Sequence, residues 1–78
     1  MDWDNVRFFL AVYRRHSLRA AARELGVDQA TAGRRLSAFE RQLGAKLFLR
    51  TPGGYLPTPV AELLAISAET PRVSMRIR

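Results

Sequence analysis

The sequence contains no cysteine and a single histidine in 78 residues. The absence of cysteine excludes a disulfide framework and any thiolate metal site. No apolar run approaches the roughly 18 residues of a membrane span, and the N-terminal Met1-Asp2-Trp3-Asp4 is acidic where a signal peptide would be basic. We therefore expect a cytoplasmic protein with one small domain and no membrane partner.

Residues suited to catalysis are equally scarce. His16 precedes Ser17, but neighbouring residues at a helix end do not hold the geometry of a catalytic triad. The seven carboxylates are scattered and have arginines nearby, so they suggest no metal cluster. Gly53-Gly54 fits a hairpin turn rather than a phosphate loop. We predict no enzymatic activity and no cofactor.

Lysine is nearly absent too, because Lys46 is the only one among 13 basic residues. The remaining twelve are arginines, and the 7 acidic residues leave a net charge of +6 and a pI near 11.3. Arginine presents a planar fork that matches phosphate oxygens and guanine edges. A pI above about 9 in a small domain is typical of nucleic-acid binding, although charge alone is equally compatible with an arginine-rich solvated surface.

Apolar residues at steps of three and four predict a first helix over residues 4–16. Its apolar face is formed by Trp3, Val6, Phe9, Leu10 and Tyr13. A second helix, residues 18–25, is expected between Ser17 as N-cap and Gly26 as C-cap. The consecutive alanines 20–22 inside it predict that another helix packs very close.

A third helix is predicted over residues 29–43, after Asp28 as N-cap and before Gly44. Its apolar stripe is Ala32, Leu36, Phe39 and Leu43. The second and third helices are joined by a short turn that contains glycine. This arrangement is a helix-turn-helix signature.

The rest of the chain predicts a hairpin and one more helix. Apolar runs at residues 47–49 and 55–57 flank a Pro/Gly turn, which favours a small β-hairpin, or wing. Thr58 and Pro59 then suit the start of a helix that continues to about residue 69. Residues 71–78 are basic and without a core pattern, so we expect them to be disordered.

In this order of elements the sequence resembles the N-terminal domain of LysR-type transcriptional regulators over roughly residues 1–66. The matching positions are Phe9, Ser17-Leu18, Ala21-Ala22, Leu25-Gly26-Val27, Gln29, Arg34, Leu36, Phe39, Glu40, Leu43-Gly44, Leu47-Phe48, Arg50-Thr51 and Leu56-Pro57-Thr58. The resemblance implies a mostly α, winged helix-turn-helix fold with a three-helix core, a small β-hairpin wing and a C-terminal linker or dimerisation helix. We accordingly divide the chain into a DNA-binding domain (1–58), a truncated linker helix (59–70) and a basic tail (71–78).

The chain also departs from the family pattern. It has Asp28-Gln29-Ala30 where the family usually has Ser-Gln-Pro, and Gly33 where the family usually has Ser. The wing tip, residues 52–54, lacks the arginine that is common there. The linker helix is short and no effector-binding domain follows, so this chain is expected to hold no small-molecule effector site. It is either a fragment of a longer regulator or a naturally short protein.

The resemblance implies double-stranded DNA as the partner, with helix 29–43 in the major groove. The base contacts we predict are Gln29, Ala30, Gly33 and Arg34. Gln can pair with adenine and Arg with guanine, each with about 1–3 kcal/mol of discrimination. The alternative is a phosphate or solvent contact for Arg34 and a solvent-exposed helix end for Gln29. Gly33 has no side chain to contact DNA, so it indicates either close backbone approach or relaxed selection.

The phosphate contacts we predict are Ser17, Thr31, Arg35 and Arg50. For Ser17 and Thr31, a role in helix capping alone is the alternative. The resemblance further implies a homodimer through the C-terminal helix, with Leu63, Leu64 and Ile66 as contacts. A two-fold dimer would read an interrupted inverted repeat. The alternative for the apolar contacts is packing within their own domain.

The alternative function is a protein-interaction module on the same fold with little sequence-specific DNA binding. Such a module could also act as a dominant-negative partner by forming mixed dimers with longer regulators. Residues before Thr58 carry nine arginines and one lysine against five acids. This balance favours phosphate binding over a neutral protein interface.

Overall fold

Four helices and one β-hairpin follow each other along residues 3–69, the part of the chain that the computed structural model describes. The elements are α1 (Trp3–Arg15), α2 (Leu18–Leu25), α3 (Gln29–Leu43), β1 (Phe48–Thr51), β2 (Gly54–Pro57) and α4 (Pro59–Glu69). The predicted mostly α, winged helix-turn-helix fold is confirmed. The tail 71–78, which we expected to be disordered, lies outside the described residues. Within residues 3–69 no helix combines the length and apolar character needed to cross a membrane.

Capping residues explain why the helices begin and end where they do. Ser17, Asp28 and Thr58 each accept a hydrogen bond from the backbone N–H three residues later, which satisfies a donor that the helix itself leaves unpaired. Gly26 and Gly44 adopt φ of 71° in the left-handed region and end α2 and α3. The predicted bounds of α2 and α3 are confirmed at both ends.

Aromatic side chains from α1, α3 and β1 meet in the core. Phe9 and Phe39 are almost fully buried, and their ring centroids lie 6.3 Å apart in an edge-to-face arrangement. Phe48 places its ring 5.7 Å from that of Phe9. Ala21 and Ala22 of α2 are also buried, which agrees with the close helix packing predicted from the alanines. This core fixes the position of α3, whose other face stays exposed.

The predicted apolar face of α1 is partly wrong. Trp3 is 64% exposed, whereas Phe8, Ala11 and Val12, which the predicted stripe omitted, are buried. The reason is that α1 contacts α2, α3, α4 and β2, so neighbours cover more than one face of the helix. Leu43, in the last turn of α3, is also partly exposed at 37%.

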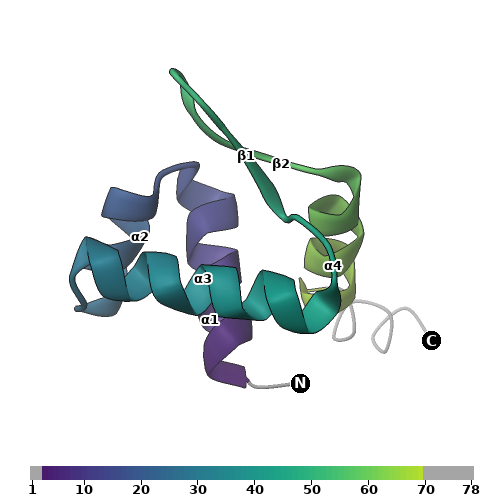
Figure 1. The fold of residues 1–78 in the computed structure, drawn as a ribbon, viewed down its shortest axis with the longest axis horizontal. Coiled ribbons are helices and arrows are strands. Elements are labelled where there is room, and N and C mark those ends of the chain that lie inside the picture. Colours follow the sequence, from purple (N-terminus) through teal and green to yellow (C-terminus); the bar gives the residue numbers. More distant parts are fainter. Residues whose placement is uncertain (1–2, 70–78) are drawn as a thin grey trace.

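The hairpin projects from the helical core and is anchored at the turn between α1 and α2 (Figure 1). β1 and β2 are antiparallel, and Arg50 pairs with Tyr55 in the register. The Tyr55 backbone N–H donates to the His16 carbonyl at 2.9 Å. Gly54 has a φ of +126°, and a Cβ there would lie 2.5 Å from the same carbonyl oxygen. Only glycine therefore lets the hairpin approach this turn.

Candidate nucleic-acid interface

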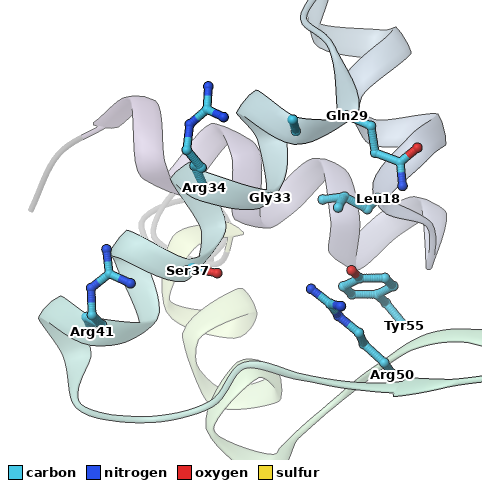
Figure 2. A pocket seen from close by; sticks show the side chains of 9 residues that line it. Leu18, Gln29, Gly33, Arg34, Ser37, Arg41, Arg50 and Tyr55 are labelled. Atoms are coloured by element: carbon cyan, nitrogen blue, oxygen red, sulfur yellow. The ribbon is translucent and has the colours of Figure 1, made fainter.

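An open groove separates the exposed face of α3 from the hairpin. Its lining residues are Leu18, Gln29, Ala30, Gly33, Arg34, Ser37, Arg41, Arg50 and Tyr55. Three of these are arginines and none is acidic. Figure 2 shows Arg34 and Arg41 projecting from α3, while Arg50 and Tyr55 lie beside one another on the strand side. A groove of this composition suits a polyanion.

The four residues predicted as base contacts all line this groove. Gln29, Ala30 and Arg34 are exposed on α3, and Gly33 lies half-buried between them. A Cβ at Gly33 would lie 3.4 Å from Leu18 Cδ2, an ordinary van der Waals contact, so the packing of α3 against α2 would accept an alanine here. Their contact with bases remains a prediction.

Four further groove residues were missed from the sequence, namely Leu18, Ser37, Arg41 and Tyr55. Ser37 and Arg41 continue the exposed face of α3 at steps of three and four from Arg34, and this periodicity was the signal that could have revealed them. Tyr55 reaches the groove only because of the strand register. Sequence pattern alone left that register open.

The wing contributes a pre-positioned arginine. The Arg50 guanidinium carbon lies 5.5 Å from the centroid of the Tyr55 ring, which is a cation–π geometry. Tyr55 is itself tied to the α1–α2 turn through its backbone N–H. The side of the wing that faces α3 therefore presents the positive charge of Arg50 in a defined position.

Three polar residues at the start of α3 form a continuous hydrogen-bonded series. The Thr31 hydroxyl donates to Asp28 Oδ1 at 2.5 Å, and the Thr31 backbone N–H donates to Asp28 Oδ2 at 3.2 Å. Arg34 Nη2 in turn donates to Thr31 Oγ1 at 3.2 Å. The hydrogen bonds from Thr31, first the side-chain bond and then the backbone bond, lower the pKa of Asp28 below its usual range. The carboxylate is therefore ionised at neutral pH.

The residues predicted as phosphate contacts do not gather in one place. Arg50 lines the groove, whereas Ser17 caps α2 beside a second hollow that includes Arg15, Arg19 and Arg23 of the α1–α2 region. The Arg35 guanidinium carbon lies 5.4 Å from the centroid of the Phe8 ring and is absent from the groove lining. Their contacts with phosphate remain predictions.

Two of the three residues predicted at the dimer contact are clearly exposed. Leu63 is 68% and Ile66 57% exposed, whereas Leu64 is half-buried and packs against the core. Leu64 also lines an apolar hollow between α4 and the start of α1, together with Trp3 and Val6. Packing within the domain therefore applies to Leu64, whereas a contact of Leu63 and Ile66 with a second copy remains a prediction.

A helix-turn-helix whose second helix shares an arginine-lined groove with a hairpin defines a winged helix-turn-helix module. The family model described as "Bacterial regulatory helix-turn-helix protein, lysR family" matches residues 3–62. The chain belongs to this family.

Curated relatives carry the names of transcriptional regulators. The chain is 40% identical over 65 residues to the HTH-type transcriptional regulator LinR of Sphingobium indicum, a match that covers 83% of this chain and 22% of LinR. It is equally similar, with the same coverage, to the HTH-type transcriptional regulator AbaB of Streptomyces antibioticus. The chain therefore spans about a fifth of the length of these relatives.

Solved structures share the fold. The BenM_DBD/catB site 1 DNA complex superposes with a TM-score of 0.74 at 26% identity and covers 99% of this chain and 96% of that chain. A LysR-family regulator from Eggerthella lenta superposes with a TM-score of 0.83 at 28% identity, over 90% of this chain and all of that one. The first of these neighbours is a complex with DNA.

Proposed function

We propose that this chain binds double-stranded DNA sequence-specifically, as the cytoplasmic reading head of a LysR-type transcriptional regulator. The observation that carries the proposal is the groove between α3 and the wing, with three arginines and no acid among its lining residues. Membership of the family and the likeness to the BenM_DBD/catB site 1 DNA complex support it.

In this proposal α3 enters the major groove, which is about 12 Å wide and admits one helix. Gln29 and Arg34 present amide and guanidinium groups to base edges, and the Ala30 methyl packs on thymine. The backbone at Gly33 comes close to the DNA because no side chain covers it. Arg34 is the residue from which we expect the largest share of discrimination.

Phosphate contacts surround this reading surface and set the position of the helix. Arg50 lies where the wing faces α3 and would contact the backbone beside the groove. Ser17 and Arg35 are the other phosphate contacts that we propose. Because each neutralised phosphate releases counterions, binding should weaken steeply as salt rises.

We further propose that two copies pair through α4, with Leu63, Leu64 and Ile66 at the contact. The exposure of Leu63 and Ile66 supports this arrangement, because large apolar side chains at the surface favour burial against a partner. A symmetric pair would bind an interrupted inverted repeat.

The test is a titration of the chain against a pool of random-sequence duplexes at two salt concentrations, with Arg34→Ala and Arg7→Ala in parallel. We expect selection of a motif, a steep loss of affinity with salt, and loss of selectivity in Arg34→Ala only. Arg7 is the control because it lies outside the groove and pairs with Asp4. Weak binding without sequence preference in the unmodified chain would refute the proposal.

A further inference from the structure

The series formed by Asp28, Thr31 and Arg34 has a defined direction. A threonine hydroxyl carries one proton and two lone pairs. Thr31 gives that proton to Asp28, so toward Arg34 its oxygen can only accept. Arg34 therefore donates to Thr31, and the Thr31 hydroxyl donates to Asp28. The guanidinium at one end and the carboxylate at the other are both ionised, which strengthens these hydrogen bonds.

We propose that Asp28 and Thr31 are positioning residues for Arg34: they orient its guanidinium at the groove and so sharpen base discrimination without contacting DNA themselves. This inference deepens the proposed function and rests on it. It competes with the phosphate contact predicted for Thr31, because the only hydroxyl proton is already used by Asp28.

The physical reason is that arginine has a long, flexible side chain. Bidentate pairing with guanine needs two N–H groups aimed in one plane, and ordering a free side chain for this costs conformational entropy. Arg34 is exposed and has no ion-pair partner among residues 3–69. The Thr31 oxygen orders one Nη and leaves the other N–H groups free for the DNA.

The negative charge of Asp28 has a second consequence. A carboxylate at the start of α3 repels phosphates, so it lowers affinity for every duplex alike. Its hydrogen bonds with Thr31 order Arg34, and this ordering favours the duplex whose base Arg34 can pair with. Asp28 therefore lowers general affinity and raises selectivity, and these two effects can be separated by experiment.

The experiment uses the full 78-residue chain, a duplex that the chain selects from the random pool, and a scrambled duplex of equal composition. Selectivity is the ratio of the two affinities, measured for the unmodified chain, Thr31→Val, Arg34→Ala and the double variant. Valine keeps the branched shape of threonine and removes the hydroxyl. Thermal melting of each variant checks that it folds.

We expect Thr31→Val to lower selectivity about fivefold, the effect of one net hydrogen bond, and Arg34→Ala to lower it roughly tenfold to a hundredfold. In the double variant the threonine change should add nothing, because it acts only through Arg34. Thr31→Ser, which restores a hydroxyl, should recover the ratio.

Asp28→Asn is the sharper variant. Asparagine remains a good N-cap, but its amide nitrogen cannot accept the Thr31 hydroxyl proton. We expect higher affinity for the scrambled duplex together with lower selectivity. A rise in affinity for both duplexes at unchanged selectivity would overturn the role of Asp28.

Two results would overturn the role of Thr31. One is that the losses of selectivity in Thr31→Val and Arg34→Ala add up in the double variant, which would make Thr31 a DNA contact in its own right. The other is seen without DNA: if the mobility of the Arg34 Nε–H, measured by NMR relaxation in the free chain, is the same in Thr31→Val, the hydroxyl does not order Arg34. If the unmodified chain shows no selectivity, the proposed function fails, and the NMR result still decides the positioning role.

Discussion

α3 and α4 both leave one face uncovered, but the two faces differ in chemistry. α3 buries Leu36 and Phe39 and exposes Gln29, Arg34 and Arg41. On α4 the fully buried side chains are those of alanines, whereas Val60, Leu63 and Ile66 stay exposed. A polar, cationic face stays hydrated until an anion binds it, whereas an exposed aliphatic face is stabilised by burial against another apolar surface. The two helices are therefore suited to different partners.

The two helices also differ in how they are held. The large side chains of α3 reach the centre of the core, so α3 cannot leave without unfolding the domain. α4 is attached by small side chains, by half-buried Leu64 and by a hydrogen bond from the Tyr13 hydroxyl to Glu62 at 2.7 Å. Val60, Leu63 and Ile66 are thus left exposed on α4, where the proposed second copy would pack.

The largest effect is expected from Phe39→Ala on the buried face of α3. Phe39 is 1% exposed and contacts Phe9, and truncation of such a ring costs about 3–5 kcal/mol. This approaches the whole stability of many small domains, so we expect the variant to be largely unfolded and unable to bind DNA. Urea unfolding followed by circular dichroism measures the loss.

Ser37→Ala is the matched control on the same helix. Ser37 lines the groove and is not part of the buried core, so truncation of its side chain should change the free energy of unfolding by less than about 0.5 kcal/mol. Similar losses in both variants would contradict the division of α3 into a folding face and a binding face.

The second effect concerns α4. Leu63→Glu should weaken the proposed homodimer, because burial of a leucine contributes about 1.5–3 kcal/mol and two-fold symmetry places the residue at the contact twice. We expect the dimer dissociation constant to rise by about 100-fold or more, with little change in the melting temperature of the monomer. Sedimentation equilibrium measures it.

Leu49→Glu controls for charge on an exposed leucine. Leu49 is 57% exposed but belongs to β1 and not to α4, so this variant should keep the dimer. If both substitutions weaken association equally, the contact is not specific to α4.

Sequence pattern was sufficient for features that depend on neighbouring residues. Ser17, Asp28 and Thr58 cap helices through contacts three residues away, and the face of α3 follows from helical periodicity, so both were predictable. The exposure of Trp3 was not, because it depends on which segments cover the first turn of α1. The Arg35–Phe8 contact and the anchoring of Tyr55 on His16 likewise join distant segments.

A third effect, of moderate size, tests the wing side of the groove. Arg50→Ala should reduce the slope of log affinity against log salt by about 0.9, which corresponds to one phosphate contact, and should weaken binding of selected and scrambled duplexes alike. The reason is that a backbone contact carries no sequence information. Salt titration with both duplexes measures this. A loss confined to the selected duplex would instead mean that Arg50 reads a base.

The smallest expected effect concerns Glu24 of α2, which does not line the groove. Arg15 Nε and Arg14 Nη2 each donate to Glu24 at 3.0 Å, and these bonds, that from Arg15 first, lower the pKa of Glu24. A carboxyl whose pKa is lower in the folded state stabilises the fold fully above its unfolded pKa, about 4.3, and loses this contribution as pH falls through its folded pKa.

Glu24→Gln should therefore melt slightly below the unmodified chain at pH 7, and the gap should close as the pH falls below about 4.3 and passes through the lowered pKa of Glu24. The effect is small because the group is solvent-exposed and water screens the pair. Asp28 titrates in the same acidic range, but it is present in both proteins, so its contribution cancels in the difference between the two melting temperatures. A gap that stays constant as the pH is lowered through the acidic range would show that glutamine perturbs packing rather than charge. We expect the DNA selectivity of this variant to be unchanged, because Glu24 does not line the groove between α3 and the wing.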